Sequence, residues 1–319
     1  MLEKIAEQLK RAKSVGIFTH TRPDGDAYGG AIALSLALNA LSIPNYICVD
    51  GDAPSNLRFL NLDEKTVRTP PFDAEAFVAV DASESARLGD TAEYFFAAKN
   101  KRKPTYNIDH HISNNRFAQF NFVKPCAANC LHIARLIAYM GVPFTKEMAE
   151  YLLVGVLTDS GNFSHDDVDE SCFLIAAELV KAGANLHRLS YELFKKQPKE
   201  RLSLLSLVTA KTRYYFENRF AAIVISKAEL EKANADLGMT EGLVDVALSV
   251  DTVEVAAALL EMKPKQYKVS LRTKFYADAN GIASTYGGGG HIRAAGCMLF
   301  GDLEDVLDRL SYTVSQYLE

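Results

Sequence analysis

The stretch VGIFTHTRPDGDAYGGAIALSLALNALS, residues 15–42, runs from a short apolar segment through a polar loop into a long apolar segment. Residues 15–19 are typical of a buried strand and residues 31–42 of a helix. Short apolar strands that alternate with helices predict an α/β fold, with a mostly parallel sheet flanked by helices. The same order recurs over the first 185 residues, with strands expected at 45–49, 76–80 and 105–108 and helices near 129–140, 145–158 and 170–182.

The rest of the chain predicts a second, smaller domain, because 319 residues exceed what one core usually supports. Residues 186–205 are charged and interrupted by Pro198, which is typical of a helical linker. Residues 206–319 contain paired strands, a hairpin turning at Pro264 and a closing helix, the make-up of an α+β domain. We therefore expect domains at 1–185 and 206–319, joined by the 186–205 linker.

Charge and hydropathy exclude some partners. The chain has 35 Lys and Arg against 40 Asp and Glu, a net charge of −5. Proteins that track long nucleic acids usually carry a basic excess, so any nucleic-acid ligand is expected to be short. No apolar run is long enough to cross a bilayer, and the amphipathic first residues do not resemble a secretory signal. We expect a cytoplasmic protein that contacts no membrane.

Acidic and histidine side chains follow the predicted strands at the point where each strand ends. Each of them alone has an ordinary explanation as a turn or helix cap. Together they lie at one edge of a parallel sheet, where α/β proteins bind their ligands, and carboxylates crowded there would repel one another without cations. These groups are His20, Asp24 and Asp26 after the first strand, Asp81 after another, Asp109, His110 and His111 after a third, and Asp159 at the end of an apolar helix.

The composition of this cluster favours two metal ions. Four or five carboxylates with two imidazoles exceed the needs of one tetrahedral zinc, but suit two ions such as manganese or magnesium that share a carboxylate. Two metals about 3.5–4 Å apart promote in-line displacement at phosphorus. Because no Cys or Ser follows the histidines in a nucleophile's position, water is the expected attacker.

A second unusual stretch is STYGGGGHIRAAG, residues 284–296. Its glycines would let a ligand approach the backbone beside His291 and Arg293, although a flexible turn is the more ordinary interpretation of a glycine run. Just upstream, residues 263–274 carry five cations and no acid. Alternation in a strand would put Arg272 on the same face as Lys268, either as a solvated surface or as a wall facing phosphate.

Five motifs in this order resemble those of the DHH phosphoesterase superfamily. The last one resembles the DHH-associated C-terminal domain of the branch that acts on nucleic acids. The length, with no membrane, sensory or OB-type extension, is similar to that of the nano-RNase and 3′-phosphoadenosine 5′-phosphate (pAp) phosphatase group. The motifs are HTRPDGD (20–26), VDAS (80–83), NIDHHISN (107–114), LLVGVLTDSGNF (152–163) and GGGGHIRAAG (287–296).

The resemblance implies an active site in the cleft between the two domains and a ligand set for two divalent ions, with Mn²⁺ favoured over Mg²⁺ or Co²⁺. The six residues implied as ligands are His20 and Asp24 for one ion, Asp26, His110 and Asp159 for the other, and Asp81 as the bridge between them.

The same resemblance implies two further groups of site residues. In the first, Asp109 would orient a neighbouring imidazole, and His111 would face the scissile phosphate. The second group would hold the substrate's phosphate or terminal nucleotide, and it consists of Gly288, Gly289, Gly290, His291 and Arg293, with Arg272 as a further candidate.

The activity implied is a Mn²⁺-dependent phosphohydrolase that releases nucleoside monophosphates from oligoribonucleotides of roughly two to five nucleotides and dephosphorylates pAp. One alternative is a soluble phosphodiesterase for linear or cyclic dinucleotides such as pApA, pGpG or c-di-AMP. A non-catalytic nucleotide-binding regulator is an alternative of another class. The sequence leaves open the cleavage polarity, the preference for RNA or DNA, the physiological metal and the oligomeric state, a homodimer included.

Overall fold

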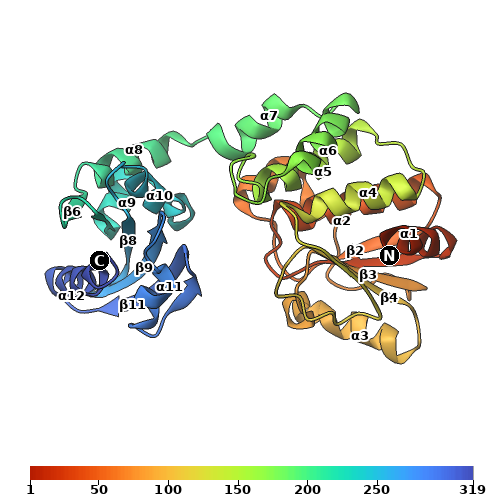
Figure 1. Ribbon diagram of the computed structural model, residues 1–319, viewed down its shortest axis with the longest axis horizontal. Coiled ribbons are helices and arrows are strands. Elements are labelled where there is room, and N and C mark those ends of the chain that lie inside the picture. The colour runs from red at the N-terminus through yellow and green to blue at the C-terminus, as the bar shows by residue number, and fades with distance from the viewer. Residues whose placement is uncertain (319) are drawn as a thin grey trace. The chain divides into compact units, whose positions relative to one another are not determined.

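The computed structural model describes residues 1–318 and divides into two compact units, each with its own core (Figure 1). The first unit is Met1–Lys196, and the second begins at Gln197. The division falls inside the segment 186–205. Helix α7 (Leu186–Ser190) and the π-helical turn η4 (Tyr191–Lys195) belong to the first unit, and α8 (Lys199–Thr209) opens the second.

The first unit is built on a parallel sheet, as the alternation of strands and helices predicts. Within the described chain the sheet has five strands, and every neighbouring pair is parallel. The edge strand β5 was not predicted, because its residues are only half buried and lack a continuous apolar run. In spatial order the strands are β2 (Asn45–Cys48), β1 (Val15–Phe18), β3 (Ala76–Val80), β4 (Thr105–Asp109) and β5 (Phe120–Val123).

Helices cover both faces of this sheet (Figure 1). On one face, Ile17 and Val78 join a core formed with the helices α1, α2, α4, α5 and α6. On the other face, Phe18 and Phe77 stack 5.9 Å apart, and Phe18 meets Phe95 of α3 edge to face. Successive strand residues thus serve opposite layers. The helices are α1 (Leu2–Arg11), α2 (Gly25–Ala40), α3 (Ala92–Asn100), α4 (Asn129–Tyr139), α5 (Lys146–Asp159) and α6 (Glu170–Lys181).

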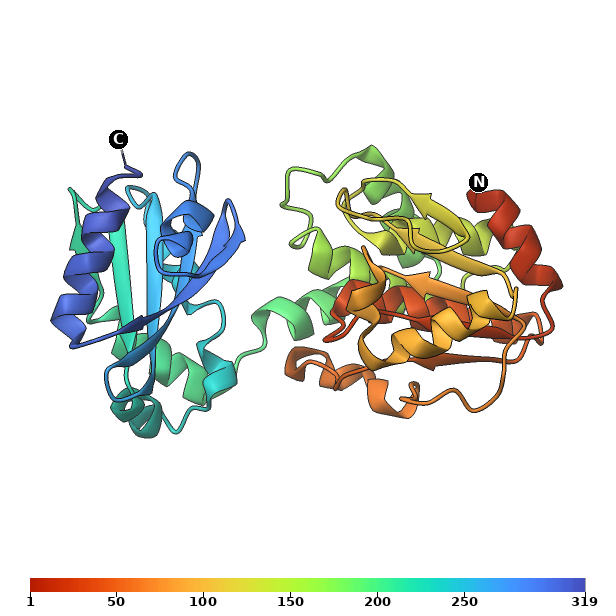
Figure 2. The ribbon, with the colours of Figure 1, turned by 90° about the horizontal axis from the view of Figure 1, so that it is seen from below.

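The second unit is an α+β layer structure, again as predicted. Its mixed sheet is antiparallel except between β7 and β8. Helices α11 and α12 cover one face, with α12 running alongside the strands (Figure 2), and α8, α9 and α10 cover the other. In spatial order the strands are β10 (Gly289–His291), β11 (Ala294–Phe300), β9 (Gln266–Thr273), β8 (Val255–Lys263), β7 (Phe220–Ile225) and β6 (Arg213–Tyr215).

The remaining elements are four helices of the second unit and the 3₁₀ turns. Besides α8, the helices of the second unit are α9 (Lys227–Ala233), α10 (Leu243–Leu248), α11 (Ala279–Ser284) and α12 (Leu303–Ser315). The 3₁₀ turns are η1 (Ser55–Leu60), η2 (Leu62–Glu64), η3 (Ser85–Thr91) and η5 (Leu237–Thr240). Among residues 1–318, no helix combines the length and the apolar character needed to cross a membrane.

Candidate metal centre

Strand order explains why distant acids and histidines meet. Strands β1, β3 and β4 are neighbours and run in the same direction, so their carboxyl ends lie side by side. The start of α2 and the end of α5 reach the same edge. Potential ligand atoms lie within 4.8 Å of one another in three groups, namely His20, Asp24 and Asp81, then Asp26, His110 and Asp159, and also Asp81, His110 and His111.

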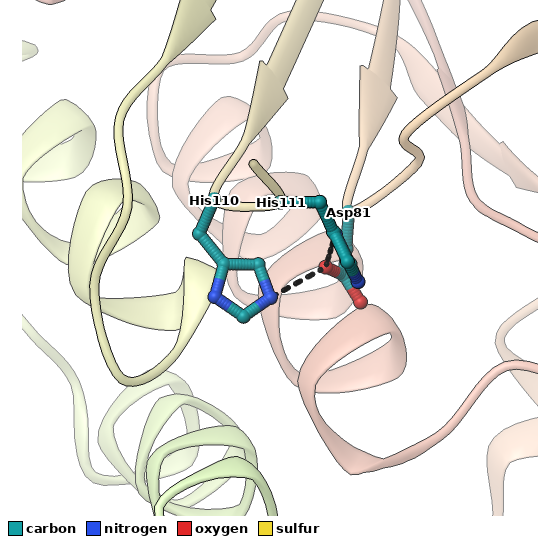
Figure 3. Close-up of side chains that lie close together, drawn as sticks. All are labelled: Asp81, His110 and His111. Atoms are coloured by element: carbon teal, nitrogen blue, oxygen red, sulfur yellow. Dashed lines mark ion pairs between the residues drawn. The ribbon is translucent and has the colours of Figure 1, made fainter. Parts of the chain in front are cut away.

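Asp81 belongs to the first of these groups and also contacts His110 of the second. Its Oδ2 is 3.5 Å from Nε2 of His20, and its Oδ1 is 3.4 Å from Nε2 of His110. Figure 3 shows His110 and His111 both turned toward this carboxylate, with Nδ1 of His111 at 3.7 Å from Oδ1. The backbone of Asp81 has φ 57°, a left-handed conformation that Asp tolerates better than most residues. The turn at the end of β3 thereby places the two oxygens of one carboxylate next to the imidazoles of His20 and His110.

Asp24 serves the helix and the site at once. Its Oδ1 accepts the N–H groups of Asp26 and Ala27, each at 3.1 Å, and so caps α2. Its Oδ2 remains 3.8 Å from Nε2 of His20. The cap also explains why α2 begins at Gly25, earlier than the expected residue 31.

Asp26 is fully buried and is held by the start of another helix. The N–H groups of Asn129 and Cys130, the first two residues of α4, donate to its two oxygens at 2.5 and 2.8 Å. The positive end of a helix favours a carboxylate there. Oδ2 of Asp26 is 4.0 Å from Nε2 of His110, which lies 3.4 Å from Oδ2 of Asp159.

His20 and His110 share one arrangement. Nδ1 of His20 lies 2.9 Å from the carbonyl of Thr21, and Nδ1 of His110 lies 2.8 Å from the carbonyl of Cys126. A carbonyl only accepts hydrogen bonds, so each Nδ1 carries a proton and donates it. When the ring is neutral, each Nε2 then keeps a lone pair directed into the site, which is the arrangement of metal-bound histidine.

The donor set fits divalent cations. Oδ1 of Asp81 and Nε2 of His110 are both buried, and neither has a hydrogen-bond partner among the described residues. Two acceptors that face each other at 3.4 Å need a proton or a cation between them. Burial and the neighbouring Asp81 raise the pKa of Asp26 to about 6. Burial, Asp26 and Asp81 together raise the pKa of Asp159, so the cluster is short of positive charge.

The pKa values of Asp81 and His110 are consistent with this shortage of positive charge. Burial would lower the pKa of His110, but Asp81, the carbonyl of Cys126 and Asp26 together outweigh it, and the pKa is raised. Burial alone would raise the pKa of Asp81, yet His110 and His20 hold it below its usual range. In the metal-free protein, therefore, a proton on His110 occupies the position that a cation would take.

Among the described residues, the side chain of Asp109 contacts His111 and Asn114. Its Oδ1 lies 2.8 Å from Nδ1 of His111, and its Oδ2 accepts a hydrogen bond of 2.6 Å from Asn114. Asn114 also donates to Oδ1 of Asn107 at 2.8 Å and to the carbonyl of Ala82. Asn107 and Asn114 were not predicted as site residues, although both lie within NIDHHISN. The only available signal was that Asn at these positions suits a local hydrogen-bonded turn.

In the second unit, the glycines that were predicted to contact substrate lie in or next to β10, the first strand of a tight hairpin with β11. A Cβ at Gly288 would overlap the carbonyl oxygen of Gly296, and Gly290, at φ 153°, has Ala294 and Ala295 equally close. Both glycines are therefore required by the packing of β10 on β11, whatever ligand is bound. At Gly289 the nearest atom to such a Cβ is Oδ1 of Asn280, at 3.7 Å, so this position is open.

The other predicted substrate residues belong to the same unit. His291 is exposed at the end of β10. The guanidinium of Arg293 donates to the carbonyls of Phe275 and Ala277, so part of its donor capacity supports a loop. Arg272 is half buried, with Nε 3.6 Å from Asp245. Alternation along β9 is as predicted, since Val269 and Leu271 are buried, whereas Lys268 is exposed and Arg272 half buried.

Comparison with known families identifies the class of protein. The model of the DHH family N-terminal domain matches residues 14–156, and the model of the DHHA1 domain matches residues 219–319. The matched regions contain the strand-end cluster, except for Asp159, and the glycine-rich hairpin. The chain therefore belongs to the DHH phosphoesterase family, as its motifs predict.

Particular relatives resemble nearly the whole chain. It is 33% identical to the bifunctional oligoribonuclease and PAP phosphatase NrnA of Thermus thermophilus, over 98% of this chain and 93% of the relative. It is 25% identical to the protein of the same name from Bacillus subtilis, over 94% of each chain. An exopolyphosphatase-related protein of Bacteroides fragilis shares the fold, with a TM-score of 0.87, 24% identity and coverage of 99% of this chain and 96% of that one.

Proposed function

We propose that this protein is a divalent-metal-dependent phosphohydrolase that cleaves oligoribonucleotides of roughly two to five nucleotides to nucleoside monophosphates and removes phosphate from pAp. The observation that carries the proposal is the position of Asp81, whose two oxygens face His20 and His110 at 3.5 and 3.4 Å. Two-metal enzymes that act on phosphate esters need two adjacent ligand groups of this kind. The names of the relatives from Thermus thermophilus and Bacillus subtilis support the substrate class.

The proposed ligand set follows the observed groups. When bound, two such ions would offset charge on the phosphate and make an attacking water more acidic. Mixed imidazole and carboxylate donors suit Mn²⁺, with Mg²⁺ and Co²⁺ as alternatives. We assign His20 and Asp24 to one ion, Asp26, His110 and Asp159 to the other, and Asp81 to both.

His111 and Asp109 act on the substrate side of this cluster. Asp109 accepts a hydrogen bond of 2.8 Å from Nδ1 of His111 and so fixes the orientation of the ring. Nε2 of His111 is then available to the scissile phosphate or to the oxygen that leaves. Because Asp109 is fully buried and Asn114 holds its other oxygen at 2.6 Å, the pair is pre-organised.

The second unit binds the substrate in this proposal. His291 and the open backbone at Gly289 would contact its phosphate or terminal nucleotide, together with Gly288, Gly290, Arg293 and Arg272. The net charge of −5 agrees with a short substrate, since neutralising many phosphates would require a basic excess.

The proposal is tested by comparing three substrates with Mn²⁺ present. Release of AMP from di-adenylate, of phosphate from pAp and of linear product from cyclic di-AMP is measured for the wild-type chain and for Asp81→Ala. We expect turnover of di-adenylate and pAp by the wild type and none by the variant.

Other results select the alternative functions. Turnover of the cyclic compound alone would identify a cyclic dinucleotide phosphodiesterase and contradict our proposal. Binding of dinucleotide without turnover in Mn²⁺, Mg²⁺ or Co²⁺ would identify a non-catalytic regulator.

A further inference from the structure

Two neighbouring aromatic side chains stand exposed on the second unit, close to the glycine-rich hairpin. Phe275 is 74% exposed and Tyr276 is 54% exposed. Ile292, which is 58% exposed, lies in the turn of that hairpin between His291 and Arg293. Single exposed apolar side chains are common on protein surfaces, so exposure by itself assigns no role. What distinguishes this group is the backbone that carries it.

One buried carboxylate holds the loop that carries the two rings. Glu254 is only 4% exposed. It accepts the N–H of Phe275 at 3.0 and 3.1 Å, that of Tyr276 at 2.8 Å and that of Ala277 at 2.9 Å. Three successive N–H groups around one carboxylate form an anion-binding nest, here filled by the protein's own side chain. The loop cannot shift without leaving a buried charge unpaired, so it is rigid.

The hairpin holds the loop from its other side. The guanidinium of Arg293 donates to the carbonyls of Ala277, at 2.9 Å, and of Phe275. The carbonyl of Ile292 accepts from Oγ1 of Thr273 at 3.2 Å and from the N–H of Ala279 at 2.8 Å, which ties both ends of the loop to the hairpin turn. With these backbone groups engaged inside, the loop presents its two rings to solvent.

Exposed rings on a loop that is hydrogen-bonded to the hairpin carrying His291 match the chemistry of a nucleotide. A nucleobase offers a flat apolar face, and every base can stack on an aromatic side chain regardless of its identity. Because the backbone under each ring is held in place, only the side-chain torsions are restricted when a base binds. His291 and Gly289 lie on β10, in the hairpin to which the loop is hydrogen-bonded, where they would meet a phosphate.

We propose that Phe275 and Tyr276 form a stacking platform for a nucleobase of the short oligonucleotide substrate, an inference that rests on the proposed function and adds a base-binding site to it. Stacking accepts any base, so the platform would select for a nucleotide but not for its sequence. It would also favour substrates with a base over abasic phosphodiesters.

The test uses the full chain and two independent readouts. In the first, a dinucleotide that contains 2-aminopurine is titrated without metal, because the fluorescence of this base is quenched when it stacks on an aromatic ring. In the second, KM and kcat are measured with Mn²⁺ for di-adenylate and for a dinucleotide with one abasic position. The variants are Phe275→Ala/Tyr276→Ala, the ring-preserving Phe275→Tyr, and Tyr312→Ala, which removes a ring that is 72% exposed on α12.

We expect the double variant to lose the quenching and to raise KM for di-adenylate by about tenfold or more, with kcat nearly unchanged. Phe275→Tyr and Tyr312→Ala should behave as the wild type, and the abasic substrate should not distinguish the variants. Equal quenching in the wild type and the double variant would overturn the platform. The platform would also be overturned if sedimentation showed that the only effect of the double variant is to convert a dimer into monomers, since the rings would then contact a second copy of the chain. Quenching without turnover of any substrate would refute the proposed function and leave the platform standing.

Discussion

Replacing Gly155 by alanine tests whether helix packing sets the position of Asp26, one of the metal ligands that we propose. Gly155 lies in α5, where this helix packs on α2. A Cβ at this position would lie 2.7 Å from Oδ1 and 2.9 Å from Cα of Asp26, and closer still to Sγ of Cys130, whereas ordinary contacts begin at 3.4 Å. Asp26 would have to move by several tenths of an ångström, which would disturb its hydrogen bonds with the N–H groups of Asn129 and Cys130.

The expected effect on stability is small, and the effect on activity is large. Alanine gains about 1 kcal/mol over glycine inside a helix, and overpacking a core costs about 1–3 kcal/mol. The net destabilisation is about 0–2 kcal/mol, which corresponds to a fall in Tm of a few degrees, at about 2–4 °C per kcal/mol. Displacing a ligand's support typically weakens a metal site by about 10- to 100-fold. We therefore expect the Mn²⁺ concentration for half-maximal turnover to rise by that factor.

The assay is a Mn²⁺ titration of di-adenylate hydrolysis, paired with thermal unfolding of the metal-free protein. Cys130→Ala alone and combined with Gly155→Ala provides the matched control, because it removes the overlap with Sγ and leaves the overlap with Asp26. The combined variant should recover stability relative to Gly155→Ala but keep the weak Mn²⁺ dependence. A wild-type Mn²⁺ dependence in Gly155→Ala, or its full recovery in the combined variant, would refute the reasoning.

Three further predictions concern the same centre. Asp81→Ala and Asp81→Asn should both lose metal-dependent turnover. The Asn variant should be the more resistant to thermal unfolding, because Asn tolerates the left-handed φ of 57°. Retained turnover in either variant would exclude the shared-ligand role. Asn114→Ala should lower kcat by about 10- to 100-fold through Asp109 and leave Mn²⁺ affinity within about twofold, and an unchanged kcat would show that this contact has no catalytic effect. Because the pKa values of His110 and Asp159 are raised, the metal-free centre holds protons at neutral pH, and Mn²⁺ must displace them. Mn²⁺ affinity should therefore rise with pH throughout the neutral range, because both groups stay protonated there when no metal is bound. Calorimetry in buffers of different ionisation heat should detect proton release on binding, and binding without proton release would contradict the raised pKa values.

The parallel sheet and the residues at its edge could be predicted because both depend on local patterns. Runs such as AFVAV, residues 76–80, are apolar throughout, and the polar residue that follows each run must lie beyond the strand's carboxyl end. Strand β5 and the early start of α2 could not be predicted in this way. The first is a half-buried edge strand, and the second depends on the capping bonds of Asp24.

Local patterns along the chain establish which chemical groups are present and the end of the sheet at which they lie, because strand direction and side-chain alternation are properties of the local chain. How these groups face one another depends on tertiary packing. The two oxygens of Asp81 are divided between His20 and His110 because β3 lies between β1 and β4. Asp26 is held by the first turn of α4, about a hundred residues further along the chain, because that helix packs beside α2. Such contacts depend on strand order and helix packing, which no local pattern encodes.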